Sequence, residues 1–505
     1  MPLSVLIWLP VGAALVAALL PERVGPRVVL GAAVVDLGIA CGYVAGFDTH
    51  AAARKLQYLT DQTWIAQLGI HYKLGLDGLN LFLVLMTTLL WVGALGAANL
   101  REWERPRLFY FQLALAESAV LGAFIAQDLA LFVGFFDLML IPFYFLVGAW
   151  GGPNRVAATT KLVIYTLVGS LLMLAAAIAL GVTAASGDRS LSFAFSDLAQ
   201  ATIGKGAQEL IFVGFAAAFL VKMPLFPLHA WMPDGYRAMP LPVLAVFSGV
   251  LSKVAAYGFL RIVLPLLPDA SVHWQLTMLV IAVVSILYGS TMAFTQTDAR
   301  LVVGFSSMAQ LGFIVLGIFS LRPEGAQGAL LQMVNHGLVV VPLFLIIGLL
   351  AARAGGSEDV RDMGGIAFRA PVLAALFLIV AFATLAMPGS ANFVGEFYIL
   401  LGTFQAKLAV ALVAAVGVVL ASVYMLRVFI RTMHNRVGER VASREISRAD
   451  ALVMVPLVAV ILAIAVYPQL PLSRAKGAVS ASVAGPQALI HPTPAAFTRV
   501  AGGTP

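Results

Sequence analysis

Cysteine is almost absent from this sequence, because the 505 residues contain only Cys41. A single thiol excludes disulfides within the chain and any iron–sulfur cluster held by this chain's own thiolates. The seven histidines are scattered, and no two stand at helical spacing, which argues against haem or zinc. The sequence also contains no glycine-rich phosphate-binding loop. We therefore expect no metal, cofactor or redox centre in this chain.

Charge is the second scarcity, since only 11% of the residues are charged and 61% are hydrophobic. The net charge is +7, but the basic residues are dispersed among short segments rather than gathered on one soluble face. This dispersal argues against a nucleic-acid partner. The composition lies far from that of a soluble domain and indicates a membrane protein, with the lipid bilayer as its surroundings.

Apolar windows of 18 or more residues recur from one end of the chain to the other, and each can cross a bilayer as a helix. We predict an all-α polytopic membrane protein with about fourteen transmembrane helices. The predicted spans lie near residues 3–20, 27–47, 78–99, 111–127, 129–150, 160–184, 210–230, 240–265, 274–296, 301–320, 326–352, 371–402, 408–430 and 450–468. After Pro471 the chain is polar and rich in small residues, and we expect a flexible tail.

Basic residues outside the spans predict the orientation, because loops rich in Lys and Arg stay on the cytoplasmic side. The densest group lies between the last two spans, and two smaller groups fall in loops of the same parity. These groups are Arg427, Arg431, Arg436, Arg440, Arg444 and Arg448; Arg101, Arg105 and Arg107; and Arg353, Arg361 and Arg369. An even number of spans then places both termini on the outer side.

Four ionisable residues stand out inside predicted spans, where a charged side chain costs from about 2.5 kcal/mol upward. Lys222 stands in "AAFLVKMPLFPLHAWMPDGY", Asp137 in "LFVGFFDLMLIPFYFLVGAW" and Lys253 in "AVFSGVLSKVAAYGFL". Glu396 follows a break in "LAMPGSANFVGEFYILLG". Charges this costly favour a functional site over a passive scaffold.

Thinner stripes of polar residues follow three neighbouring spans at helical spacing, so each stripe shares one helix face. The stripes are Tyr288, Thr291 and Thr295; Ser306, Ser307 and Gln310; and Gln332, Asn335 and His336. A bundle that turned these faces inward would contain a wet polar channel.

Two spans are expected to be broken helices. Pro224 and Pro227 interrupt the seventh span, and "MPGSAN" at 387–392 interrupts the twelfth. Broken helices at membrane depth are tolerated only where protein or a water-filled cavity satisfies the freed backbone groups. If spans four to eight and nine to thirteen form two inverted repeats, the broken span is the fourth helix of each. The predicted units are 1–110 (helices 1–3), 111–265 (first repeat), 266–432 (second repeat) and 433–505 (helix 14 and the tail).

Six stretches, in order along nearly the whole chain, carry a resemblance to a known family. They are "GLDGLNLFLVLMTTLL" (75–90), "DLMLIPFYFLVGAWGG" (137–152), "YTLVGSLLML" (165–174), "KMPLFPLHAWMPD" (222–234), "QMVNHGL" (332–338) and "PGSANFVGEFYILLG" (388–402). They resemble chain M, an antiporter-like membrane subunit of bacterial respiratory complex I, the proton-translocating NADH:quinone oxidoreductase. The resemblance implies fourteen helices with two inverted five-helix repeats, in a bacterial plasma (inner) membrane.

The resemblance also implies roles for particular residues. Lys222 would be the central lysine of the first broken helix, and Asp137 its carboxylate partner. Lys253 would be a relay lysine, Glu396 the exit-side carboxylate, and Glu117, in "LALAESAVLGAF", matches a carboxylate of the fourth span. The implied partners are the other membrane subunits of complex I, including the neighbouring antiporter-like subunits. NADH, FMN, iron–sulfur clusters and quinone would belong to partner subunits.

The sequence departs from the family in three places. Asp137 stands where the family usually has glutamate, so its pairing with Lys222 is expected to be looser or water-bridged. Gln310 stands where the family usually has histidine, and an amide carries no proton at neutral pH. The segment "GYRAMPLPVLAVFSG" (235–249) is closer to the related subunits of multisubunit Na⁺/H⁺ antiporters and membrane-bound hydrogenases, which stay open as alternatives.

The residues suggest a pump element. Asp137 should keep Lys222 protonated, because opposite charges at close range favour each other. When the pair separates, the proton would leave through Lys253 and the His336 region toward Glu396. For His336 a packing role stays open, as it does for Glu117, and His229 could either carry protons or help to close the broken helix. The other histidines, His50, His71, His273, His434 and His491, are interpreted as loop residues.

Overall fold

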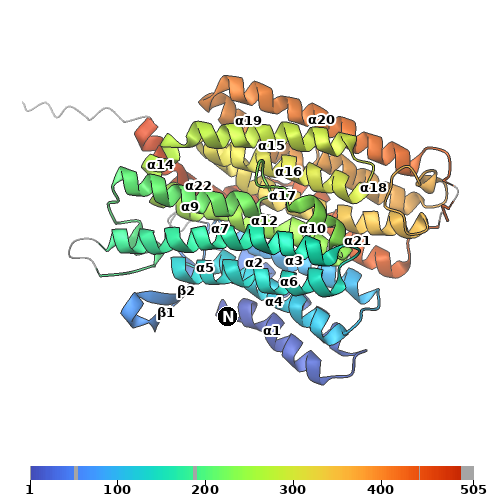
Figure 1. The fold of residues 1–505 in the computed structure, drawn as a ribbon, viewed down its shortest axis with the longest axis horizontal. Coiled ribbons are helices and arrows are strands. Elements are labelled where there is room, and N and C mark those ends of the chain that lie inside the picture. Colours follow the sequence, from blue (N-terminus) through green and yellow to red (C-terminus); the bar gives the residue numbers. More distant parts are fainter. Residues whose placement is uncertain (1, 50–54, 186–189, 439, 443, 491–505) are drawn as a thin grey trace, which may run out of the picture.

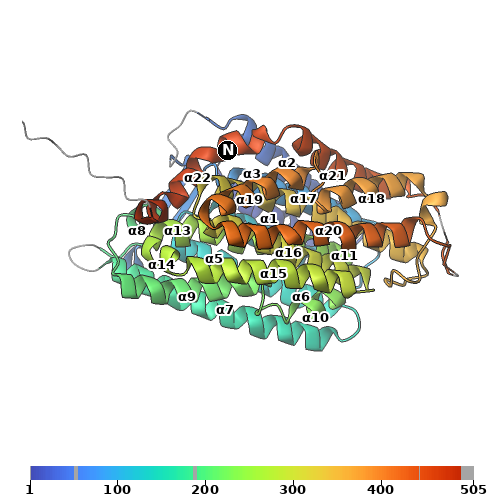
Figure 2. The ribbon, with the colours of Figure 1, turned by 90° about the horizontal axis from the view of Figure 1, so that it is seen from above.

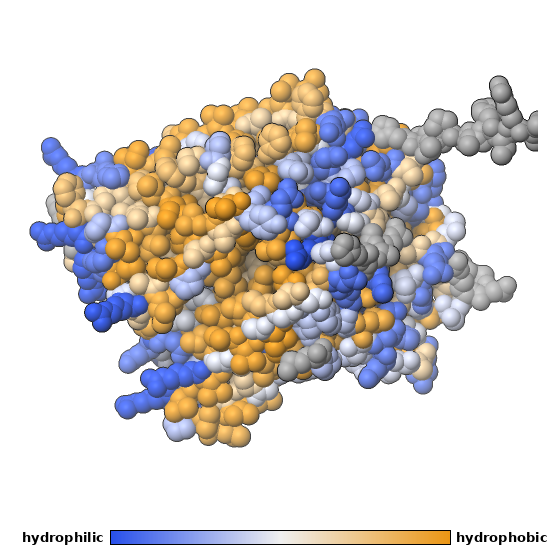
Figure 3. All heavy atoms as spheres, turned by 180° about the vertical axis from the view of Figure 1, so that it is seen from behind, coloured by the Kyte–Doolittle hydropathy of each residue, from blue (hydrophilic) through white to orange (hydrophobic). Residues whose placement is uncertain are grey.

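Long helices lie side by side along one direction and form the body of the protein (Figures 1 and 2). The structure is a computed structural model, and it describes residues 2–49, 55–185, 190–438, 440–442 and 444–490. Figure 3 shows one face with a broad apolar band across its middle and hydrophilic residues gathered at its two ends. An apolar belt between polar ends is the surface that a bilayer requires.

Among the described residues, eleven of the predicted spans contain one uninterrupted helix over most of their length. They are α1 (Ser4–Leu19), α2 (Gly25–Ala45), α3 (Leu81–Asn99), α4 (Pro106–Ile125), α7 (Arg155–Ala184), α9 (Lys205–Lys222), α15 (Gln275–Thr295), α16 (Ala299–Phe319), α17 (Pro323–Arg353), α20 (Leu408–Met433) and α21 (Arg448–Val466). Short helices in the connections are η1 (Ala66–Leu68), α8 (Phe195–Leu198), α10 (Met232–Ala238), α14 (Pro268–His273) and η4 (Ile366–Phe368).

Three further spans are built from consecutive pieces. They are α5 (Leu129–Leu138) with α6 (Leu140–Trp150); α18 (Pro371–Thr384) with α19 (Ala391–Ala406); and α11 (Leu241–Val246), the π-helix η2 (Phe247–Leu251), α12 (Ser252–Gly258), the π-helix η3 (Phe259–Val263) and α13 (Leu264–Leu266). Of these interruptions, the sequence analysis anticipated only the break between α18 and α19.

Each of the fourteen predicted windows overlaps a helix. Within the described residues, eleven helices or helical runs are long and apolar enough to cross a membrane. The other three windows correspond to the shorter α1, to α9, which ends at Lys222, and to the broken pair α18 and α19. The helical fold class is confirmed, whereas the division into two inverted repeats stays a prediction.

The central helices are the most deeply buried. The most apolar windows of α16 and of the run 241–266 are 100% buried, and that of α17 is 94% buried. The corresponding values for α20 and α21 are 33% and 22%, so these two helices present a wide face to their surroundings. The polar stripe residues of α16 and α17 therefore lie inside the bundle, as the sequence predicts. The stripe on α15 does not, because Thr291 and Thr295 are exposed and Tyr288 is only partly buried.

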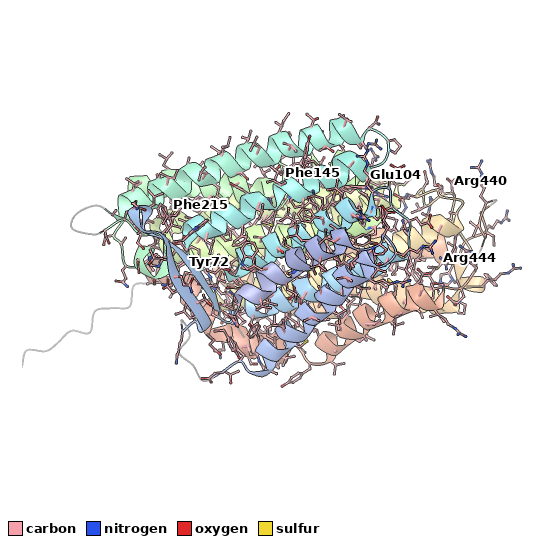
Figure 4. All side chains as sticks on the ribbon, turned by 90° about the horizontal axis from the view of Figure 1, so that it is seen from below. Tyr72, Glu104, Phe145, Phe215, Arg440 and Arg444 are labelled. Carbon is pink, nitrogen blue, oxygen red and sulfur yellow. The ribbon has the colours of Figure 1, made fainter. Side chains whose placement is uncertain are left out.

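A β-hairpin between α2 and α3 was not predicted. Strand β1 (Gln57–Ile65) pairs antiparallel with β2 (Ile70–Leu76), and Gly69 connects them in the left-handed conformation that a tight turn requires. The hairpin lies at one end of the bundle, away from the arginine-rich connection between α20 and α21 (Figure 4). His71 lies in β2 and His273 is the last residue of the short helix α14 (Pro268–His273), so the interpretation of these two histidines as loop residues is wrong.

The prediction of a flexible tail after Pro471 is wrong for the described part of that segment. Helix α22 (Gln469–Ile490) packs against α17, α13 and α14. Its small residues allow close approach to these helices, and Ala475, Ala478 and Val479 are buried there. Composition alone could not separate the two cases. Small and polar residues are typical of a flexible tail, but they also suit a helix that packs along one face. Residues 491–505, with His491, lie outside the described residues, as does His50.

Candidate proton-conducting site

Lys222 is the last residue of α9, where the helix breaks inside the membrane. Neither Pro224 nor Pro227 has an N–H to continue the helical hydrogen bonds, so the chain leaves the helix at Met223. Trp231 bridges the break, because its indole Nε1 donates to the carbonyl of Val221 over 3.0 Å. The lysine is therefore held in a buried position, with only 8% of its surface exposed.

The Lys222 ammonium contacts α5. Its Nζ donates to the carbonyl oxygen of Phe136 over 3.2 Å and lies 4.3 Å from the centre of the Phe136 ring. The contact lies near the end of α5 at Leu138, where the span is interrupted before α6 begins at Leu140. A cavity of about 10 Å³ borders Lys222 and Thr166, which is close to the smallest volume that one water molecule needs.

Asp137 lies beside this contact without forming a direct ion pair. The charges of Asp137 and Lys222 act on each other, but among the described residues their nitrogen and oxygen atoms form neither a hydrogen bond nor an ion pair within 4.0 Å. Asp137 is partly buried, and its Oδ1 has no partner in the described part of the chain. This geometry agrees with the looser pairing expected from a carboxylate one methylene shorter than glutamate.

Lys253 is completely buried on α12, between two π-helical segments. A π-helical turn widens the helix and leaves backbone carbonyls free for other donors. The Lys253 ammonium uses one of them, since its Nζ donates to the carbonyl of Ser248 over 2.7 Å and to the Ser252 hydroxyl over 3.2 Å. The lysine is thus solvated by neutral oxygens only.

A line of hydroxyl groups leads from the Lys253 site to α17. The Ser248 hydroxyl lies 3.1 Å from the Ser307 hydroxyl of α16, and the Ser307 hydroxyl lies 2.9 Å from Nε2 of His336. The charge of Lys253 also acts on His336. Sequence analysis identified Ser307 and His336 but missed Ser248. The sequence did show Ser248 five residues before Lys253. That spacing places the two residues on one helix face only in a π-helix, in which residue i pairs with residue i+5.

Glu396 is buried on α19, after the break at Pro388, and faces α16. Gln310 connects it to α17, because its Nε2 donates to Glu396 Oε1 over 2.8 Å while its Oε1 accepts from Gln332 Nε2 over 2.7 Å. Gln310 therefore serves as a hydrogen-bond bridge between α17 and α19, at the position where the resemblance sets the family's histidine. The same region contains the Tyr424 hydroxyl, 2.8 Å from the Ser306 hydroxyl, which sequence analysis missed.

The line is not continuous. In the described residues no hydrogen bond joins Lys222 to Lys253, and none joins His336 to Gln310. Lys253 also bonds the backbone carbonyl of Ser248 and not the Ser248 hydroxyl, so the lysine and the hydroxyl line meet at one residue without a direct hydrogen bond. Two other expected site residues lie off the line. His229 packs between the rings of Phe226 and Tyr288 and is partly exposed, while Glu117 on α4 faces α2 instead of Lys222.

Arg300 fixes the end of α10, the short helix in the connection that follows the break after Lys222. Its Nη1 donates to the carbonyls of Tyr236 and Met239 at the end of α10, over 3.0 and 2.6 Å. Its Nε donates to Glu358 Oε2 over 2.7 Å, so the arginine charge is balanced. This clamp holds α10 against the start of α16 and thereby keeps the break in place.

Comparisons with known proteins place these residues in a family. A family model described as "NADH:quinone oxidoreductase/Mrp antiporter, TM" matches residues 126–422. The chain is 35% identical over 484 residues to the NADH-quinone oxidoreductase subunit M of Rhodobacter capsulatus, covering 93% of each chain. It is 37% identical over 507 residues to that of Mycobacterium tuberculosis (strain ATCC 25618 / H37Rv), covering 92% of this chain and 91% of the relative.

Solved structures agree with the sequence comparison. A chain of the respiratory complex I from Thermus thermophilus with bound NADH superposes with a TM-score of 0.87 at 30% identity, covering 96% of this chain and 99% of that one. A chain of the Mrp complex from Dietzia sp. DQ12-45-1b shares the fold, with a TM-score of 0.82 at 20% identity over 96% of this chain and 98% of that one. The chain therefore belongs to the family of NADH:quinone oxidoreductase and Mrp antiporter transmembrane subunits.

Proposed function

We propose that this chain is the proton-translocating, antiporter-like membrane subunit M of a bacterial respiratory NADH:quinone oxidoreductase. The observation that carries the proposal is a buried cluster within the span-forming helices: Lys253 bonds the Ser248 carbonyl, and the Ser248 hydroxyl leads through the Ser307 hydroxyl to His336. A buried ammonium beside a hydroxyl chain and an imidazole is an arrangement that can move protons and has no evident structural need. The relatives named subunit M, which match over nearly the whole chain, support the same assignment.

The first step concerns Lys222 and Asp137. Lys222 keeps its proton while the carboxylate of Asp137, the carbonyl of Phe136 and the Phe136 ring stabilise the ammonium. A shift of α5 relative to α9 would weaken all three contacts together, because Phe136 and Asp137 are adjacent on α5. The proton then moves more easily, and the interruption between α5 and α6 is the natural place for such a shift.

The second step passes the proton along the line. Lys253 accepts a proton that crosses the gap from Lys222 through bridging water, and the hydroxyls of Ser248 and Ser307 carry it to His336. Glu396 is the exit carboxylate, and Gln310 orients it without carrying the proton. The resemblance sets a histidine of the family at the position of Gln310. This supports a proton path along the side of α16 on which Gln310 lies.

The driving energy must come from elsewhere in the assembly. Each proton moved against the membrane potential costs about 2.3 kcal/mol per 100 mV. We expect quinone reduction in a partner subunit to supply it, with NADH, FMN and iron–sulfur clusters also bound by partners. The other membrane subunits of complex I, including its antiporter-like neighbours, are the expected contacts. A role in a Na⁺/H⁺ antiporter is less favoured, because the Mrp similarity is one of fold.

We place the arginine-rich end of the bundle in the cytoplasm and both termini outside. Arg101, Arg353 and Arg444 come from three different connections, and they border one cavity of about 540 Å³. Their shared location supports the parity argument, and Figure 4 places Glu104, Arg440 and Arg444 at one end of the molecule. The protein is a multi-pass membrane protein of a bacterial respiratory complex.

The decisive experiment replaces Lys222 with alanine in the complete complex, purified in mild detergent and reconstituted in liposomes. We expect the complex to assemble, with flavin and iron–sulfur absorbance intact, and proton uptake per NADH oxidised to fall severalfold. Lys205→Ala is the matched control, since Lys205 lies at the start of the same helix and its side chain is 82% exposed. Normal pumping by a fully incorporated Lys222→Ala chain would refute the role of Lys222. Absence of flavin and iron–sulfur absorbance from the purified assembly would refute the respiratory assignment.

A further inference from the structure

Two buried carboxylates lie away from the proposed proton path, between α2 and α4. Asp36 is the twelfth residue of α2 and Glu117 the twelfth residue of α4, and the two helices pack against each other. Both helices are long enough to cross a bilayer, so both carboxylates lie near the middle of the membrane. The charges of the two side chains act on each other.

Neither carboxylate is satisfied by a protein group. Asp36 and Glu117 are both 0% exposed. All four of their oxygens lack a hydrogen-bond partner in the part of the chain that the structure describes. Buried polar oxygens are nearly always paired with a donor, so four unpaired oxygens in one place indicate a ligand that supplies hydrogen bonds or charge.

The helices around the pair provide no counter-charge. Helices α1 and α3, which pack against both α2 and α4, contain no ionisable side chain. Tyr43, two turns after Asp36 on the same face of α2, is the other group on which Asp36 acts, and its phenol is neutral in the physiological range.

The remaining elements against α4 also carry ionisable groups, but none of them acts on Glu117. Asp137 on α5 and Lys253 on α12 belong to the proposed path. The others are Tyr144 on α6, Tyr257 on α12, and His71, Tyr72 and Lys73 on β2, together with Arg107 and Tyr110 on α4 itself. Asp36 and Glu117 therefore form a separate electrostatic unit.

Two ionised carboxylates in this position would repel each other, and each would forfeit several kcal/mol of hydration. One proton held between them removes a charge and provides a hydrogen-bond donor. We propose that Asp36 and Glu117 form a carboxylate pair that holds a shared proton at membrane depth, as a second proton site beside the path from Lys222 to Glu396. This site goes beyond the proposed function, none of whose steps uses Asp36.

A proton fits the pair better than a metal ion does. Calcium takes six to eight oxygen ligands, and magnesium needs octahedral coordination. No third Asp, Glu, His or Cys joins the two carboxylates among the described residues, and α1 and α3 surround them with apolar side chains. A single proton removes one of the two charges and needs no coordination shell of further ligands.

The test uses a reagent that reacts with protonated carboxyl groups in an apolar setting. Dicyclohexylcarbodiimide is lipid-soluble: the acid proton moves to one of its nitrogens, the carboxyl oxygen bonds to its central carbon, and an acyl shift to nitrogen leaves a stable adduct with no leaving group. The purified full chain in lipid nanodiscs would be treated at a series of pH values, and modified peptides identified by mass spectrometry. We expect modification of Asp36 or Glu117 to persist through neutral pH.

The sharing of the proton is tested by two reciprocal variants. Asp36→Asn should lower the pH midpoint for modification of Glu117 by about one unit or more, because the repelling charge is gone. Glu117→Gln should lower the midpoint for Asp36 by the same amount, since coupling between two sites is mutual. Glu22→Gln, which removes an exposed carboxylate just before α2, should change neither midpoint.

Two outcomes would overturn the proposal. The first is that neither carboxylate is modified at any pH, which would mean that both are ionised and stabilised by another group. The second is that the midpoints are unchanged in the variants, which would mean that the two residues hold protons independently. If one variant fails to fold, as judged by size-exclusion chromatography, the other measures the same coupling.

Discussion

The absence of one methylene group in Asp137, compared with glutamate, keeps its carboxylate out of direct contact with the Lys222 ammonium. Glutamate at position 137 could reach further toward the Lys222 ammonium, whereas the shorter aspartate leaves it to the carbonyl and ring of Phe136. The charge of Asp137 still acts on Lys222 across this gap. The residue pair is therefore held by a long-range attraction that a small movement can alter, which suits a switch better than a tight ion pair would.

Substitutions at Asp137 separate charge from reach. Asp137→Asn keeps the volume and removes the charge, so we expect proton uptake in liposomes to be nearly abolished while the complex still assembles. Asp137→Glu should remain active with a slower maximal rate, because attraction at an effective dielectric of 20 amounts to about 4 kcal/mol at 4 Å and grows as the charges approach. Incorporation of each variant is checked on a gel. Equal pumping by Asn and Asp would show that the carboxylate is only structural.

At the scale of the element, interruptions in helices position the proposed path. Lys222 ends α9 at a proline break, Asp137 precedes the interruption between α5 and α6, Lys253 sits between two π-helical segments, and Glu396 follows the break at Pro388. Each interruption frees backbone groups or widens the helix where an ionisable side chain needs hydrogen-bond partners. The elements are therefore irregular at the positions where the ionisable residues lie.

The contribution of Arg300, which holds the end of α10 after the break at Lys222, can be measured. Arg300→Gln would leave Glu358 without its cation and the carbonyls at the end of α10 without their donor. We expect a loss of about 3 kcal/mol in stability, seen as a lower thermal unfolding midpoint of the purified chain. Arg237→Gln is the control: Arg237 pairs with Asp298 at 3.4 Å but is 53% exposed, and such surface pairs contribute about 1 kcal/mol or less. Similar midpoints for the two variants would argue against the clamp.

At the scale of the whole molecule, the two ends of the bundle differ. The hairpin lies at one end and the arginine-rich connections at the other, as the positions of Tyr72, Arg440 and Arg444 in Figure 4 illustrate. By the positive-inside rule, the arginine-rich end faces the cytoplasm. Several connections contribute arginines to that end, so the orientation follows from the whole bundle and not from one loop.

Cysteine accessibility tests the orientation. In a Cys41→Ala background, we expect a membrane-impermeant maleimide added to intact cells to label Gln62→Cys in β1 and to leave Asn435→Cys after α20 unlabelled. Both positions are exposed, and both should react once the membrane is opened with detergent. The reverse pattern in intact cells would place the arginine-rich end outside and would contradict the proposed direction of proton release.

Local chemistry determined much of this protein in advance. The spans follow from apolar windows, and the breaks after Lys222 and before Glu396 follow from prolines that cannot donate a backbone hydrogen bond. The ionisable residues of the proposed path were also visible, because an ionisable side chain in an apolar window stands out whatever surrounds it. Each of these inferences needs only residues that are neighbours in the sequence.

Tertiary structure decided which of those residues meet. Ser248 becomes informative only through its hydrogen bond to Ser307, 59 residues away, and Tyr424 only through its hydrogen bond to Ser306, 118 residues away. Asp36 likewise becomes informative only through its electrostatic interaction with Glu117. The packing of α22 and the pairing of β1 with β2 likewise depend on surfaces formed by the folded chain. Contacts between distant segments are set by how whole helices pack and which faces they turn inward, and hydropathy along the chain does not contain that information.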